Sequence, residues 1–206
     1  MTDDEADAPR EVGVGPHPRP WPDDPRLDPE LLASGDRRNV LDRYRYWSVD
    51  AIVRDLDLHR HPFHVAIEHW TRDPNIGSVV RSANAFGARA VHIVGRHRWN
   101  RRGAMKTEAY LHLHTHDDLA SLVAFAGGAA LPIVAVDNGP DATPLWSAEL
   151  PRACVLLFGQ EGAGVTPEAL AVATTTLAIP QYGSTRSINA AAAAAIAMAE
   201  WCRRWA

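Results

Sequence analysis

Strand-length apolar runs alternate with helix-like patterns along most of this 206-residue chain, and this alternation limits the possible folds more than any other feature. The apolar runs predict strands at His64–Trp70, Ala90–Gly95, Tyr110–His116, Leu131–Asp137, Ala153–Gly159 and Thr176–Pro180. Helical patterns occur at Ile76–Phe86, Asp118–Ala126, Pro167–Ala173 and Ile188–Trp205. Because strands that alternate with helices usually pair in parallel, we predict an α/β fold with a mainly parallel sheet flanked by helices.

The amino-terminal part of the chain does not follow this alternation. Residues 1–30 are rich in proline and hold nine acidic against three basic side chains, with few regularly spaced apolar residues. Such a composition buries too little apolar surface to offset the entropy lost on ordering, so we expect a disordered tail. Ser48 can cap a helix with one apolar stripe. We therefore predict a helical extension over residues 31–63 and the main domain over residues 64–206.

Composition also bears on where the protein works. The longest apolar stretch, Ala190–Ala199, is shorter than the roughly 18–20 residues that cross a bilayer, so we expect no membrane span. The amino terminus is acidic, whereas a secretory signal begins with positive charge followed by an apolar segment. Cys154 and Cys202 are the only cysteines. These features predict a reduced, cytoplasmic protein with no membrane partner.

Several common cofactor motifs are missing from the sequence. The single lysine, Lys106, follows a methionine, which excludes a phosphate-binding P-loop. The glycines of residues 159–164 have the spacing G-x-x-G-x-G, so a nicotinamide oxidoreductase is only a weak alternative. Zinc motifs are absent, and His112, His114 and His116 would share one face of a strand. We interpret these histidines as the exposed polar face of an edge strand and predict no metal site.

A basic segment suggests a polyanionic partner. Between residues 96 and 106 the chain has five basic side chains, one histidine and no acid; the basic residues are Arg96, Arg98, Arg101, Arg102 and Lys106. Such a cluster suits RNA phosphates, although a solvated basic loop would have the same composition.

Two predicted strands are followed by unusual polar residues, at the edge of the sheet where α/β proteins bind ligands. After the first strand, Asn75 can cap a helix, Gly77 lets the backbone approach a ligand, and Arg81 lies in the second turn. A structural cap and a surface ion pair are the simpler interpretations of Asn75 and Arg81. After the fifth strand, an apolar run ends in Gly159 and Glu161, which is typical of a ligand cradle but also of a tight turn.

A third segment follows the last predicted strand. Ile179 and Pro180 lead through a glycine-containing loop to Ser187 and Asn189, just before an alanine-rich helix. Ser187 could bind a ligand or cap this helix.

Together, and in this order, the three segments resemble the SpoU (TrmH-like) class of RNA ribose 2′-O-methyltransferases in the SPOUT superfamily. The resemblance covers residues 64–205 and rests on the motifs N-x-G-x-x-x-R, F-G-x-E-x-x-G and I-P…S-x-N. One conservative departure is Ile188, which stands where leucine is usual.

The resemblance implies a fold in which the carboxyl-terminal segment threads a deep trefoil knot and binds S-adenosylmethionine. It also implies a homodimer that completes the RNA site. By analogy, Gly159, Ile179 and Ile188 would contact the cofactor through backbone groups, and spacing suggests Val136 as a fourth contact.

The implied reaction is attack of a ribose 2′-hydroxyl on the methyl group of a sulfonium. In the family Arg81 would be the base, but neutralising an arginine at pH 7 costs about 8 kcal/mol, so a phosphate clamp is an equal alternative. Glu161 would orient Arg81 or the loop, Asn75 and Ser187 would hold ribose and phosphate, and Asn189 would brace the loop or the start of the helix.

The substrate is inferred from what the amino-terminal part lacks. Several relatives that modify rRNA carry an additional RNA-binding domain, and residues 1–63 are too short and too acidic at their start to form one. We therefore favour tRNA over rRNA. A noncatalytic RNA-binding module with the same fold is the alternative from another functional class.

Overall fold

The computed structural model describes residues 13–68, 75–96, 99–160 and 163–206. The chain divides into two compact units, residues 1–55 and 56–206. The predicted boundaries follow residues 30 and 63. The boundary between the two units instead falls within α2 (Val49–Asp57).

The second unit contains a seven-stranded, wholly parallel sheet in the order β3-β2-β1-β6-β4-β7-β5. The strands are β1 (His64–Glu68), β2 (Val91–Val94), β3 (Leu113–His116), β4 (Ile133–Val136), β5 (Thr143–Pro144), β6 (Val155–Phe158) and β7 (Thr175–Ala178). The predicted α/β fold with a parallel sheet is thus confirmed. Of the predicted first strand, residues 69 and 70 lie outside the described residues.

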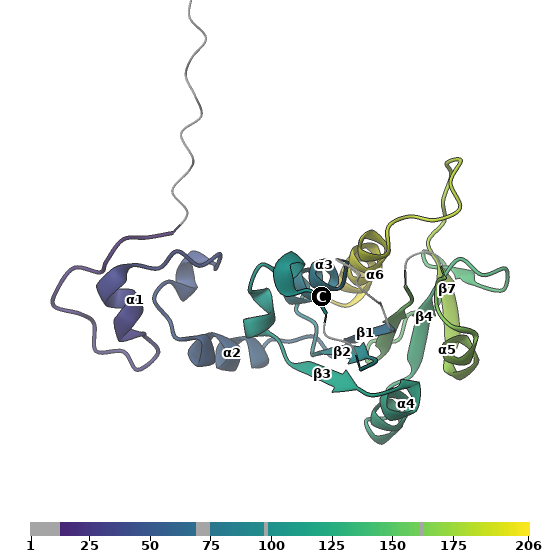
Figure 1. Cartoon of the computed structure of the whole chain (residues 1–206), viewed down its shortest axis with the longest axis horizontal. Helices are drawn as coiled ribbons and strands as arrows, with labels where there is room; N and C mark the ends of the chain where they lie inside the picture. The colour runs from purple at the N-terminus through teal and green to yellow at the C-terminus, as the bar shows by residue number, and fades with distance from the viewer. Residues whose placement is uncertain (1–12, 69–74, 97–98, 161–162) are drawn as a thin grey trace, which may run out of the picture. The chain divides into compact units, whose positions relative to one another are not determined.

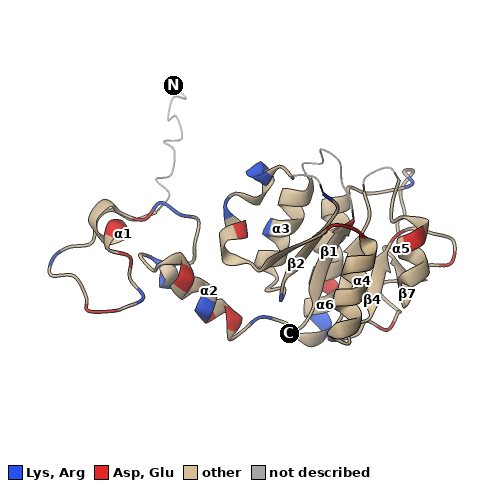
Figure 2. Ribbon diagram, turned by 60° about the horizontal axis from the view of Figure 1, so that its bottom comes forward, with Lys and Arg blue, Asp and Glu red and all other residues tan. Residues whose placement is uncertain are grey.

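Helices cover both faces of this sheet (Figure 1). On one face lie α3 (Asn75–Ala85) and α6 (Ala190–Trp205), and on the other lie α4 (Leu119–Gly128) and α5 (Pro167–Val172). Successive strand residues point to opposite faces, so Val65 and Ile67 pack with α3 and α6 while Ala66 packs with α4 and α5. Charged residues gather on the helices and loops rather than in the strands (Figure 2). Of the helices within the described ranges, none is both long and apolar enough to span a bilayer.

The order of the strands determines where a site can form. The chain first adds β2 and β3 on one side of β1, and later places β6, β4 and β7 on the other. In the register, Phe158 at the end of β6 pairs with both Ile67 of β1 and Val136 of β4. The carboxyl ends of these three strands are therefore adjacent, at the reversal of strand order where α/β sheets bind ligands.

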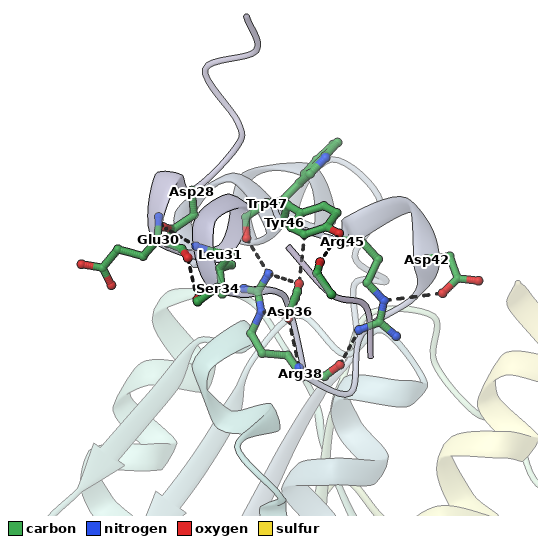
Figure 3. A network of polar contacts seen from close by, with 11 residues as sticks. Asp28, Glu30, Leu31, Ser34, Asp36, Arg38, Asp42, Arg45, Tyr46 and Trp47 are labelled. Atoms are coloured by element: carbon green, nitrogen blue, oxygen red, sulfur yellow. Dashed lines mark hydrogen bonds and ion pairs between the residues drawn. The ribbon is translucent and has the colours of Figure 1, made fainter. Parts of the chain in front are cut away.

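The first unit holds α1 (Pro29–Ser34), η1 (Asp42–Tyr44) and the start of α2. At its centre is Asp36, whose side chain is 0% exposed. The carboxylate accepts hydrogen bonds from Arg38 Nε at 2.9 Å and from the Tyr46 backbone N–H at 3.0 Å (Figure 3). Burial raises the pKa of Asp36, but these hydrogen bonds outweigh it and lower the pKa to about 2.

The structure differs here from the predicted disordered tail. Val14 exchanges two backbone hydrogen bonds of 2.9 Å with Asp36, and the Arg26 guanidinium lies 4.3 Å from the centre of the Trp47 ring. Residues 13–30 are thus held by polar and cation–π contacts, which an apolar periodicity does not reveal. Residues 1–12 lie outside the described residues.

Candidate active site at the carboxyl ends of the central strands

A cavity of about 250 Å³ opens where β4, β6 and β7 end. Its lining includes all four residues predicted to contact the cofactor, namely Val136, Gly159, Ile179 and Ile188. Ser187 lines the same cavity. The structure thus brings together segments that are far apart in the sequence.

The loop after β6 folds back tightly on itself. Gln160 and Gly164 exchange two backbone hydrogen bonds of 3.1 and 2.9 Å. A Cβ at Gly159 would lie 2.0 Å from the carbonyl carbon of Gly164, so only glycine fits at position 159. Gly164 itself has a φ of +73°, in the left-handed region that favours glycine. Glu161, predicted to orient Arg81, lies outside the described residues.

Two carboxylates hold this loop in place. Asp137, just after β4, accepts the backbone N–H of Val165 at 2.7 Å. Glu68, at the end of β1 and only 6% exposed, accepts the backbone N–H of Thr166 at 2.9 Å and also its hydroxyl. The sequence analysis missed Glu68, although an acid at the end of an otherwise apolar strand was a visible signal.

The first and third motifs meet through two asparagines. The Asn189 Oδ1 accepts the backbone N–H groups of Ala191 and Ala192 at 3.0 and 3.1 Å and so caps α6. This leaves the Asn189 Nδ2 to donate to Asn75 Oδ1 at 2.9 Å. Asn189 rather than Ser187 is therefore the cap of α6. The predicted bracing of the helix start by Asn189 has a direct geometric counterpart.

Ser187 and Arg81 are exposed. Ser187 faces the cavity. Arg81 lies on α3, and its guanidinium has no hydrogen bond or ion pair within the part of the chain that the structure describes. It does not line the cavity.

Gly77 has a different role from the predicted one. A Cβ at Gly77 would lie 2.6 Å from the backbone nitrogen of Ala104 and 2.7 Å from the Cα of Gly103. The close approach is therefore to η2 (Arg101–Ala104), and not to a ligand. The prediction of a close contact at this glycine is correct, but its predicted partner is wrong.

The basic segment packs against α3 through η2. Its Arg101, Arg102 and Lys106 are exposed. Arg96 is also exposed, but it pairs with Asp117 at 3.6 Å. Arg98 lies outside the described residues. The segment therefore presents basic side chains beside the helix that carries Asn75 and Arg81.

The predicted histidine face is more buried than expected. His114 is exposed on β3, an edge strand, but His116 is buried and lies 2.8 Å from His92, ring nitrogen to ring nitrogen. His92 in turn lies 2.9 Å from His64. Burial, with smaller effects from neighbouring charges, lowers the pKa of His92 to about 3 and that of His64 to about 4. Within the described ranges, no group of three or more His, Cys, Asp or Glu side chains could hold a metal ion.

Comparison with known proteins gives a consistent assignment. The SpoU rRNA Methylase family matches residues 62–199. The tRNA (guanosine(18)-2′-O)-methyltransferase of Escherichia coli strain K12 is 30% identical over 139 residues, which are 66% of this chain and 61% of that protein. The chain thus spans about three fifths of the length of that relative.

Two solved structures share both the fold and about a quarter of the aligned residues with this chain. The SpoU methyltransferase AviRb from Streptomyces viridochromogenes, solved in complex with AdoMet, has a TM-score of 0.64 at 25% identity and covers 73% of this chain and 60% of that one. The AdoMet-bound rRNA methyltransferase from Sinorhizobium meliloti has a TM-score of 0.62 at 26% identity, with coverages of 74% and 60%.

Proposed function

Because the chain belongs to the SpoU rRNA Methylase family, we propose that it is an S-adenosylmethionine-dependent RNA methyltransferase acting on a ribose 2′-hydroxyl. The observation that carries the proposal is the single cavity that Val136, Gly159, Ile179 and Ile188 line together at the carboxyl ends of the central strands. Relatives solved with AdoMet support the same cofactor.

The chemistry of the cavity lining fits this cofactor. Val136, Ile179 and Ile188 offer apolar walls for an adenine ring, and Gly159 lines the cavity with backbone alone. Asp137 and Asn138 add polar groups for the charged methionine part. When bound, the cofactor supplies a methyl group activated by a positively charged sulfur.

The side chains around the cavity would align the RNA. Ser187 and Asn75 would hold the ribose and its phosphate, with Asn189 fixing Asn75 through their hydrogen bond. Arg81, which has no ion pair with any described residue, suits a phosphate clamp. Alignment alone can supply about 7–11 kcal/mol of a reaction barrier, so the clamp does not require a neutral arginine. Glu161 would orient Arg81 or its loop.

The proposed substrate is tRNA, and the proposed location of the enzyme is the cytoplasm. The E. coli relative described as a tRNA methyltransferase favours tRNA, whereas the S. meliloti structure keeps rRNA as the alternative. Arg101, Arg102 and Lys106 would contact phosphates beside α3. We further propose the homodimer and the trefoil knot that are typical of the family.

Incubation with labelled S-adenosylmethionine and total RNA tests the proposal. We expect label in the tRNA fraction, and nuclease mapping to a nucleotide that resists alkaline cleavage on its 3′ side, because the 2′-hydroxyl is blocked. Cofactor binding without transfer to any RNA would instead support a noncatalytic RNA-binding module. A thermal shift with NAD but not with S-adenosylmethionine would support the oxidoreductase alternative.

A further inference from the structure

The segment between β7 and α6 is fixed at both ends. Ile179 packs in the core, and Asn189 caps α6 and bonds to Asn75. Near its second end, the Asn138 Nδ2 donates to the backbone carbonyl of Arg186 at 3.3 Å. Between these anchors the segment extends away from the sheet (Figure 1). We refer to residues 180–188 as the β7–α6 loop.

Tyr182, in the middle of this loop, is 92% exposed. Among the residues that the structure describes, its ring and hydroxyl make no hydrogen bond and no aromatic contact. A Cβ added at the neighbouring Gly183 would meet nothing within 4 Å, so the space around this part of the loop is open. Both faces of the tyrosine ring are therefore available to a partner.

Arg186 adds a positive charge to the same loop. It lines the cavity next to Ser187, and its guanidinium has no hydrogen bond or ion pair to any part of the chain described here. Its backbone is held by Asn138, which keeps the side chain beside the cavity. The loop thus combines an open aromatic ring with an unpaired cation, and the cation lies on the wall of the proposed cofactor site.

An unstacked nucleotide offers a binding partner for each of these side chains: a flat base for the aromatic ring and a negatively charged phosphate for the arginine. Aromatic rings stack on bases without regard to sequence, and an arginine pairs with the adjoining phosphate. We infer that the β7–α6 loop recognises the nucleotide at or next to the methylated ribose, with Tyr182 stacking on its base and Arg186 binding its phosphate. The inference rests on the proposed RNA methyltransferase function and names the part of the RNA that this loop contacts.

The stacking contact is tested with Tyr182→Ala and the matched control Tyr182→Phe, using a mixed tRNA preparation as the probe. Loss of one base–aromatic stack weakens binding by about 5- to 150-fold, so we expect Tyr182→Ala to raise the Kd and the KM for tRNA within this range. Tyr182→Phe keeps the ring and is expected to stay within about twofold of the wild type. Because the side chain is exposed, thermal unfolding should be unchanged in both variants.

The phosphate contact is tested with Arg186→Gln, and Arg152→Gln is its control. Arg152 is also exposed but precedes β6, at the opposite end of that strand from the cavity. The slope of log Kd for tRNA against log salt should fall by about 0.7–0.9 in Arg186→Gln and remain unchanged in Arg152→Gln. Equal slopes in both variants would contradict a phosphate contact.

Cofactor affinity, measured by titration calorimetry without RNA, separates this inference from the proposed function. We expect Tyr182→Ala, Tyr182→Phe and Arg152→Gln to bind S-adenosylmethionine within a few-fold of the wild type. If Tyr182→Ala binds tRNA as tightly as the wild type and with the same KM, the inference is wrong even though methylation continues. If the wild type binds no cofactor, the proposed function fails, and the tRNA affinities alone still decide the role of the loop.

Discussion

Three hydrogen-bonded histidine rings, His64, His92 and His116, cross β1, β2 and β3 beneath Phe125 of α4. A neutral His92 donates one of its two hydrogen bonds and accepts the other, whereas a protonated His92 would donate both and carry a positive charge. Protonating it would place that charge on a ring that is 0% exposed, away from the water that would stabilise it. We therefore predict that acid destabilises the second unit well above the pH at which its carboxylates titrate.

The direction and size of the change in stability with pH follow from the lowered pKa values of the histidines. Unfolded histidine has a pKa near 6.5, whereas the folded pKa is about 3 for His92 and about 4 for His64. Below pH 6.5 the unfolded chain therefore binds more protons than the folded chain, and stability falls as the pH is lowered. Between pH 7.5 and pH 5, His92 loses about 2 kcal/mol of stabilisation. The combined loss stays below about 4 kcal/mol, because part of the shift at His92 comes from the charge of His64.

Urea unfolding at pH 7.5 and pH 5 measures this effect in the wild type and in His92→Gln. Glutamine keeps a donor and an acceptor but does not titrate. We expect the variant to be less stable at pH 7.5 but to lose about 2 kcal/mol less than the wild type on acidification. The acidic groups are the same in both proteins, so their contributions cancel in the difference. Identical pH dependence in the two proteins would refute the reasoning.

Four substitutions at three residues test other parts of the site. Arg81→Ala should abolish methylation while cofactor affinity stays within a few-fold, and a near-normal rate would exclude Arg81 from the reaction. Gly77→Ala places a Cβ 2.6 Å from the backbone of Ala104 and should lower stability by about 1–3 kcal/mol in thermal unfolding. Asn189→Asp keeps the cap of α6 but loses the donor to Asn75, so turnover should fall with little loss of stability; Asn189→Ala should also lose about 1 kcal/mol.

The sheet and the cavity could be predicted from the sequence because their signals are local. Buried parallel strands are continuous apolar runs, and the residues that follow them must gather at one edge of the sheet. The cofactor contacts themselves came from elsewhere: Gly159, Ile179 and Ile188 from the resemblance to the family, and Val136 from its spacing. β5 (Thr143–Pro144) was missed, since two residues are too short to show a periodicity.

Other features depend on which segments become neighbours. A glycine indicates a close approach but not its partner, so the contact of Gly77 with η2 could not be deduced. The histidine row joins side chains from three different strands, and only the strand order brings His64, His92 and His116 together. Residues 13–30 are ordered through individual polar and cation–π contacts such as that of Arg26 with Trp47, which leave no repeating pattern in the sequence.

The amide pair Asn75–Asn189 has a mechanical consequence. One asparagine begins the helix that carries Arg81, and the other begins the helix that follows the cavity wall. If that wall moves when a small molecule binds or leaves, either the hydrogen bond between the two asparagines breaks or the helix that carries Arg81 moves too. We therefore expect cofactor binding in the cavity to affect how firmly Arg81 is positioned for a phosphate.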